Sequence, residues 1–110
     1  ACSFLVPSTV RRGDLTIAIS TGGGSPALAK KLRQRLERTI GPEYEAYLTA
    51  LRLLRERAKQ AIADPEARQV LYRRAVESDL FERAAGGDTA AVAAYIEDLL
   101  QSAPPASAET

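Results

Sequence analysis

A run of hydroxyl and glycine residues, ISTGGGSP at residues 19–26, is the stretch of this sequence best suited to chemistry. It lies between an alternating apolar segment and a helical pattern, and a strand, a glycine-rich loop and a helix in this order place anions at a helix N-terminus. Backbone amides and hydroxyl groups of the loop could then donate hydrogen bonds to a phosphate or a carboxylate. The candidate binding residues are Ser20, Thr21, Gly22, Gly23, Gly24 and Ser25.

The loop matches neither of the two common nucleotide fingerprints. It contains no G-x-x-x-x-G-K-[ST] motif, and GGGSPA differs from G-x-G-x-x-G. No acidic residue follows about twenty positions later in a parallel strand, as it does in a dinucleotide-binding fold. The alternative is a plain connector between strand and helix, and the residues alone leave both readings open.

Residue counts argue against several classes of site. The chain has no histidine and a single cysteine, Cys2, so we expect no internal disulfide, no protein-only zinc or haem site and no nucleophile–histidine pair. The tyrosines lie at helical spacings, which favours core or interface roles over catalysis. No apolar run approaches the length of a membrane span, and the single cysteine fits a reducing cytoplasm.

Charge is distributed unevenly along the chain. Residues 1–60 hold eleven Lys and Arg against five Asp and Glu, whereas residues 61–110 hold four against nine. This asymmetry indicates an anionic partner for the first half or packing between the halves. A nucleic-acid partner for the basic helix after Pro26 is disfavoured, because few aromatic or amide side chains accompany the basic residues and the overall pI is only about 8.1.

The hydrophobic pattern predicts an α+β protein that is mostly α, with one N-terminal β-hairpin followed by four or five helices. The expected strands are 4–10, where Pro7 indicates an edge or a bulge, and 15–19, with a turn over 11–14. An isolated hairpin is marginal in water, so helices or another chain must cover it.

Start and stop signals place the helices. Ser25-Pro26, Asp64-Pro65 and Asp88 are N-terminal signals, and Ser78 is a candidate cap for a short turn that ends at glycines 86–87. The expected organisation is a hairpin dimerisation segment with the glycine loop (1–24), a helical domain (25–101) and a flexible tail or linker (102–110). Methionine is absent and the first residues are already strand-like, so we expect a piece of a longer chain.

Residues 3–37, SFLVPSTVRRGDLTIAISTGGGSPALAKKLRQRLE, carry a more specific signal. Ser-Phe, Pro-Ser, an apolar strand, a hydroxyl pair, Gly-Gly-x-Ser-Pro and Leu-Ala follow one another without gaps. In this order they resemble the middle of the siroheme synthase family, the NAD-dependent precorrin-2 dehydrogenases, many of which are also sirohydrochlorin ferrochelatases. The matching residues here are Ser3-Phe4, Pro7-Ser8, Ile17 to Ile19, Ser20-Thr21, Gly22-Gly23, Ser25-Pro26 and Leu28-Ala29.

The resemblance implies what the parent protein does. An upstream Rossmann domain would bind NAD, and the helical domain would help to enclose the tetrapyrrole. Residues 20–25 would line the tetrapyrrole pocket, where a helix N-terminus and nearby basic residues suit a polycarboxylate. The hairpin would form the interface of a homodimer through Phe4, Val6, Pro7, Val10, Leu15, Ile17 and Ile19.

The chain also departs from the family pattern. The NAD-binding loop and the catalytic aspartate of the family lie upstream of Ala1, so we expect no catalytic, cofactor-binding or metal-binding residue and no dehydrogenase activity in this chain alone. Thr21 stands where serine is common, and Gly24 fills the variable position. The alternative function is a stand-alone helical binding or interaction module without a catalytic role, which would fold as a closed monomer.

Overall fold

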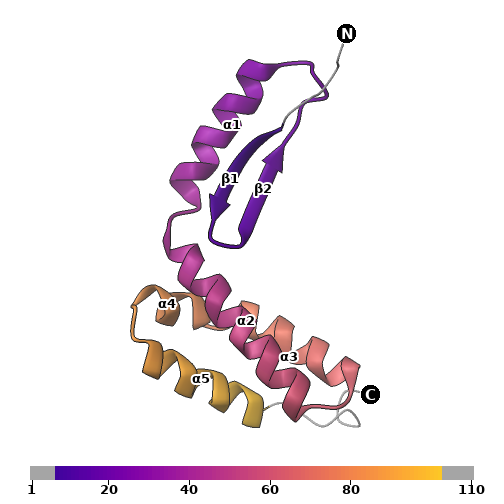
Figure 1. The fold of residues 1–110 in the computed structure, drawn as a ribbon, viewed down its shortest axis with the longest axis vertical. Helices are drawn as coiled ribbons and strands as arrows, with labels where there is room; N and C mark the ends of the chain where they lie inside the picture. The colour runs from indigo at the N-terminus through magenta and orange to yellow at the C-terminus, as the bar shows by residue number, and fades with distance from the viewer. Residues whose placement is uncertain (1–6, 103–110) are drawn as a thin grey trace. The chain divides into compact units, whose positions relative to one another are not determined.

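The computed structural model describes residues 7–102, so Phe4 and Val6 of the predicted interface lie outside the described residues. The described part is mostly helical, with one hairpin followed by five helices, which confirms the predicted fold class (Figure 1). The elements are β1 (Ser8–Arg12), β2 (Leu15–Ile19), α1 (Pro26–Thr39), α2 (Glu43–Ala61), α3 (Pro65–Glu77), α4 (Leu80–Ala85) and α5 (Thr89–Gln101).

The chain divides into two compact units, residues 1–45 and residues 46–110. Helix α1 belongs to the first unit with the hairpin, whereas the sequence-based division grouped it with the later helices. None of the helices in the described part is long and apolar enough to cross a membrane. No group of three or more potential metal ligands occurs within residues 7–102.

The loop of the hairpin is shorter than the sequence suggested. Strands β1 and β2 are antiparallel, and Arg12 pairs directly with Leu15, so the loop consists of Gly13 and Asp14 alone. The predicted turn over 11–14 is therefore wrong in length, because the two arginines belong to β1. A two-residue hairpin loop needs positive φ at a central position, and Gly13 supplies it with φ 61°.

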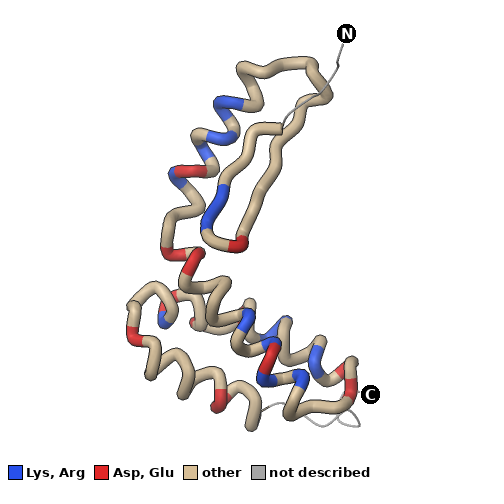
Figure 2. Tube along the Cα trace, viewed as in Figure 1, with Lys and Arg blue, Asp and Glu red and all other residues tan. Residues whose placement is uncertain are grey.

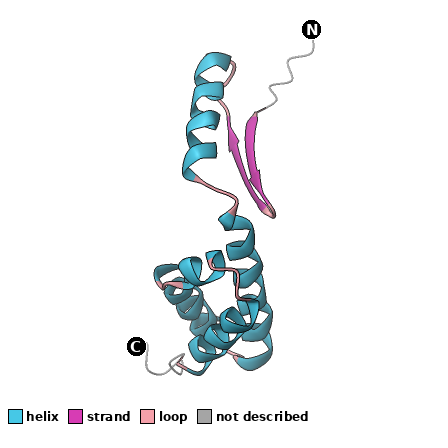
Figure 3. Ribbon diagram, turned by 90° about the vertical axis from the view of Figure 1, so that its left-hand side faces the viewer, coloured by secondary structure: helices cyan, strands magenta, loops and turns pink. Residues whose placement is uncertain are grey.

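One face of the hairpin packs against α1 within the same chain. Side chains alternate along a strand, so Val10 and Arg12 share a face. Val10 is only 1% exposed, and the Arg12 guanidinium reaches the backbone of α1. Helix α1 runs alongside the hairpin in both views (Figures 1 and 3). Its buried residue is Ala29. Helix α1 thus provides the packing surface that a two-stranded sheet requires for stability.

The second unit encloses a small core between its helices. Two predicted N-terminal caps are confirmed: Asp64 accepts from the amide of Glu66 at 3.3 Å and Asp88 from that of Ala91 at 3.1 Å. Half of the core consists of alanine, which lets the helix backbones approach closely while the larger side chains fill the centre. The core residues are Ala50, Leu54, Ala58, Leu71, Ala75, Leu80, Ala84 and Ile96.

Arginine side chains from neighbouring elements satisfy the C-terminal ends of helices. The Arg68 guanidinium donates to the Ile62 carbonyl oxygen at 2.7 Å, just after α2, and Arg74 donates to the Ser102 oxygen at 3.2 Å, just after α5. These carbonyl groups have no partner inside their own helix and carry the negative end of its dipole. Arg68 and Arg74, two of the positive charges counted in the sequence, therefore stabilise helix ends of the fold.

A charged pair and a tyrosine connect α4 with α5. Arg83 Nε donates to the Asp79 carboxylate at 3.1 Å, and the Arg83 guanidinium lies 4.1 Å from the centre of the Tyr95 ring. A hydrogen bond from Tyr95, followed by the bond from Arg83, lowers the pKa of Asp79 below its ordinary value of 3.8. The ionised carboxylate is thus favoured in the folded state, and it contributes stability at neutral pH.

We expect Tyr95→Phe to lower the melting temperature at neutral pH and to have no effect in strong acid. A carboxylate whose folded pKa is depressed adds stability above its unfolded pKa, and this contribution disappears as the pH falls through the folded pKa. The difference in melting temperature between wild type and variant should therefore shrink below about pH 4. Circular dichroism melts from about pH 7 to pH 2 measure it. A difference that is independent of pH would contradict this role of the phenol.

Candidate ligand-binding loop

Hydrogen bonds of Thr21 cross the loop between β2 and α1. The Thr21 hydroxyl accepts from the Ser25 amide at 3.0 Å and donates to the Ser25 carbonyl oxygen at 3.2 Å. The Thr21 carbonyl oxygen in turn accepts from the Gly24 amide at 3.0 Å. Because its hydroxyl group is used in both directions inside the loop, Thr21 shapes the loop.

The glycines are required by the backbone conformation of the loop. Gly22 and Gly23 have φ values of 64° and 82°, in the left-handed region that residues with a side chain rarely adopt. At Gly24 a Cβ atom would lie 3.2 Å from the Thr21 carbonyl oxygen. The glycine run therefore builds a defined turn between β2 and α1.

The loop presents unused hydrogen-bond donors at the start of α1. Ser25 is the predicted N-cap, because its Oγ accepts from the Leu28 amide at 3.1 Å, and Ser20 Oγ accepts from the Gly22 amide at 3.2 Å. Both hydroxyl groups still have a hydrogen to donate. Among the described residues, the amides of Gly23 and Ala27 have no acceptor. These four donors come from one short segment, which an anionic ligand could contact.

The electrostatic setting of this helix end favours an anion. The first turn of α1 contains no acidic side chain, so nothing in the helix itself neutralises the positive end of its dipole. Lys30 and Lys31 follow in the next turn and are exposed. Figure 2 shows basic positions along α1. A carboxylate near Ser25 would be stabilised by the positive end of the helix dipole.

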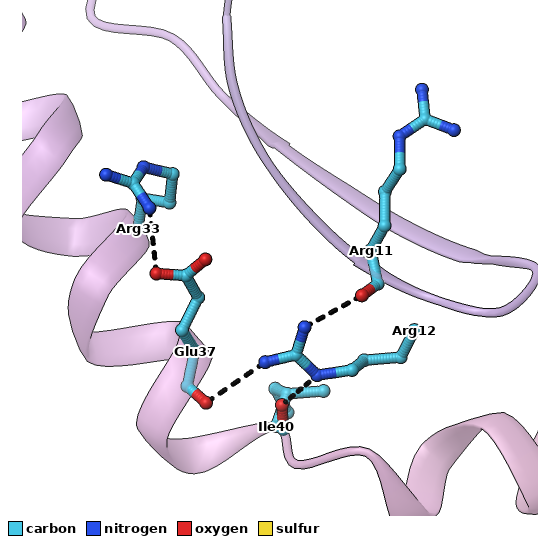
Figure 4. A network of polar contacts seen from close by, with 5 residues as sticks. All are labelled: Arg11, Arg12, Arg33, Glu37 and Ile40. Atoms are coloured by element: carbon cyan, nitrogen blue, oxygen red, sulfur yellow. Dashed lines mark hydrogen bonds and ion pairs between the residues drawn. The ribbon is translucent and has the colours of Figure 1, made fainter.

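Two other basic residues of this unit, Arg12 and Arg33, form contacts within the fold. Arg12 donates through Nε to the Ile40 carbonyl oxygen at 2.8 Å and through Nη2 to that of Glu37 at 3.2 Å, at the C-terminal end of α1. Arg33 forms an ion pair with the Glu37 carboxylate at 2.8 Å. Figure 4 shows both contacts, with Arg11 pointing away from them. Sequence reasoning missed the capping role of Arg12, because its partners lie 25 and 28 residues away.

The described residues of the predicted hairpin interface are partly covered by their own chain. Val10 is buried, whereas Leu15, Ile17 and Ile19 are half-buried and Pro7 is exposed. In the strands, Val10 pairs with Ile17, which places both on the face that packs against α1. Their role in an interface between two chains stays a prediction.

Comparison with known proteins identifies the class. Residues 12–39 match the family model described as "Sirohaem biosynthesis protein central", and residues 48–100 match the model described as "Sirohaem synthase dimerisation region". Together the two models cover most of the described chain, including β2, the glycine loop, α1 and most of the helical unit. The chain belongs to the siroheme synthase family.

Individual relatives agree with this placement. The chain is 38% identical over 86 residues to a siroheme synthase of Methylococcus capsulatus, covering 78% of this chain and 18% of that protein. It is 33% identical over 102 residues to a precorrin-2 dehydrogenase of Methanosarcina barkeri, covering 86% of this chain and 46% of that protein. The chain thus spans less than half the length of either relative.

A solved structure supports the fold. The chain superposes on SirC, a precorrin-2 dehydrogenase, with a TM-score of 0.70 at 21% sequence identity, and the match covers 88% of this chain and 48% of that one. At this identity the likeness concerns the arrangement of the elements. It is consistent with the confirmed prediction of a hairpin followed by helices.

Proposed function

We propose that this chain is the self-associating and tetrapyrrole-binding part of a siroheme synthase whose whole form oxidises precorrin-2 to sirohydrochlorin with NAD. The match to a dimerisation region supports self-association. The similarity to a protein named precorrin-2 dehydrogenase supports the proposed reaction of the whole form. The observation that carries the binding role is the loop of residues 20–25, with unused donors at the start of a basic helix.

The chemistry of the ligand fits this loop. Precorrin-2 carries several carboxylates, which accept hydrogen bonds from amides and hydroxyl groups and are stabilised by positive charge. Ser20, Ser25 and the amides of Gly23 and Ala27 would bind one carboxylate. Lys30 and Lys31 would attract the others. The role of this part of the protein is to bind and orient the substrate.

NAD does not fit the described residues. Dinucleotide binding uses a parallel βαβ unit in which the glycine-rich turn follows a strand of a parallel sheet. Here the glycine loop follows an antiparallel hairpin, which is the only sheet within residues 7–102. We propose that NAD binds to another part of the whole protein, where it accepts the hydride removed from precorrin-2.

We expect Thr21→Val to weaken binding of sirohydrochlorin to this chain by about tenfold or more, because two hydrogen bonds that shape the loop are lost, each contributing about 1 kcal/mol. Thr21→Ser keeps the hydroxyl group and should stay within about threefold of wild type. Absorbance titration of the tetrapyrrole measures the affinities, and far-ultraviolet circular dichroism checks the fold.

The matched control is Thr16→Val, the same substitution at an exposed position on β2. It should leave the affinity unchanged, and a sirohydrochlorin esterified at all its carboxylates should bind to no variant tightly. Equal affinities for wild type and Thr21→Val would contradict the role of the loop. Equal binding of the ester would show that carboxylates are not the recognised groups.

A further inference from the structure

One exposed side of α1 combines a leucine with a row of basic side chains. Leu28 is 47% exposed, and Lys31, Arg35 and Arg38 are exposed as well. These residues follow one another at intervals of three or four positions, the spacing that places helical side chains on one face. Together they are called the cationic face of α1 below.

The hairpin covers another side of α1 and leaves the cationic face exposed. Ala29 is buried, and Leu32 and Leu36 are half-buried. These three residues also recur every three or four positions, as expected for the side of an amphipathic helix that faces its own core. Leu28 lies among basic residues and is nearly half exposed, so its apolar surface remains available to a ligand.

The basic side chains of this face have no anionic partner in the described part of the chain. Glu37 is the only acidic residue of α1, and its carboxylate pairs with Arg33. Within residues 7–102, no hydrogen bond or ion pair involves the side chains of Lys31, Arg35 and Arg38. Like charges three or four positions apart on a helix repel one another, so an anionic ligand would relieve this repulsion.

We infer that the tetrapyrrole lies against the cationic face of α1, with Leu28 on its apolar macrocycle and Lys31 and Arg35 on carboxylates at its edge. The inference rests on the proposed binding role of the loop and adds residues that select the ligand. A polycarboxylate tetrapyrrole offers both properties that this face requires, since its conjugated ring is apolar and its side chains are anionic. The Leu28 amide donates to Ser25 Oγ, so the face begins at the loop itself.

The length of the face explains why a ligand with several carboxylates is required. A helix rises about 1.5 Å per residue, so Lys31 lies about 9 Å and Arg35 about 15 Å beyond Ser25 along the axis. A single carboxylate at the loop does not reach these side chains, whereas other carboxylates of the same ligand would. The face should therefore favour a polycarboxylate over a ligand with one anionic group.

Absorbance titration of the chain with sirohydrochlorin, at low and at high ionic strength, tests this face. We expect the double variant Lys31→Gln/Arg35→Gln to raise the Kd at least about tenfold at low ionic strength. The difference should fall below about threefold at about 1 M salt, because salt screens exposed charges. Leu28→Gln should raise the Kd about fivefold at both ionic strengths, since an apolar contact is not screened.

Matched controls come from the second unit. The double variant Lys59→Gln/Arg73→Gln removes two exposed positive charges from α2 and α3, and Val76→Gln replaces an apolar side chain that is 61% exposed. Both should keep the Kd within about twofold of wild type. Far-ultraviolet circular dichroism checks that every variant is folded.

The outcomes separate the inference from the proposal beneath it. A wild-type chain that does not bind sirohydrochlorin would refute the binding role and the inference together. Wild-type affinity in Leu28→Gln or in Lys31→Gln/Arg35→Gln, with weaker binding by Thr21→Val, would refute the inference alone. Equal losses for the two double variants would show that only net charge matters and would also overturn it. So would a duplex oligonucleotide that binds as tightly as sirohydrochlorin and is lost in Lys31→Gln/Arg35→Gln, because the face would then belong to nucleic acid.

Discussion

Leu71→Ala is expected to destabilise the helical unit by about 2–5 kcal/mol, the range measured when a fully buried leucine is truncated to alanine. Leu71 lies in the middle of α3 and is 0% exposed. It belongs to the same core cluster as Leu54, Leu80 and Ile96, so the substitution would leave a cavity among side chains from several helices.

This loss is large relative to the total free energy of unfolding that a unit of this size can have. A single core in a chain segment of this size rarely supplies more than about 3–5 kcal/mol. The variant should therefore be largely unfolded in its second unit at room temperature. Urea denaturation followed by circular dichroism measures the free energy of unfolding of both proteins.

The matched control lies on the same helix. Val76→Ala removes an apolar side chain that is 61% exposed and should change the free energy of unfolding by no more than about 0.5 kcal/mol. A cost below about 1 kcal/mol for Leu71→Ala would show that the core is not packed as described.

Arg12→Ala is expected to destabilise the hairpin unit by about 2 kcal/mol, because hydrogen bonds from a charged donor contribute about 1.5–3 kcal/mol. Arg12 caps the C-terminal end of α1 through the carbonyl oxygens of Glu37 and Ile40, at 3.2 and 2.8 Å. Truncation would leave these oxygens without their donors and remove a positive charge from the negative end of the helix dipole.

Two further variants make the test specific. Arg12→Lys keeps the charge but lacks the planar fork that reaches two carbonyl oxygens, so it should recover only part of the stability. Arg11→Ala removes the same side chain from the opposite face of β1 and should cost about 0.5 kcal/mol or less. Urea denaturation measures all three, and equal losses for Arg11→Ala and Arg12→Ala would refute the capping role.

Local signals in the sequence predicted the elements well. The N-terminal boundaries of α1, α3 and α5 were predicted from Ser25, Asp64 and Asp88, and each of these side chains accepts a hydrogen bond from its own helix. Capping involves residues two or three positions apart, so it can be read from a short stretch of sequence. The hairpin was also found, but the predicted turn over 11–14 was two residues too long, because Arg11 and Arg12 belong to β1.

The candidate site was located from sequence, although its internal structure was not. The order of hydroxyl residues, glycines and Ser-Pro marked residues 20–25. Which hydroxyl groups face outward depends on the loop conformation, and the structure shows that Thr21 directs both its donor and its acceptor to Ser25. The pattern could not distinguish this shaping role from direct contact with a ligand, because both require a hydroxyl group.

The sequence by itself determined the family, the order of the elements and the position of the glycine loop, because these depend on residues close together in the chain. Only the tertiary structure decided that α1 covers the hairpin, that Arg12 caps a helix more than twenty residues away, and that the cationic face of α1 is left exposed by this packing. These features arise from contacts between distant segments, and the spacing of residues along one element carries no information about which element will pack against it.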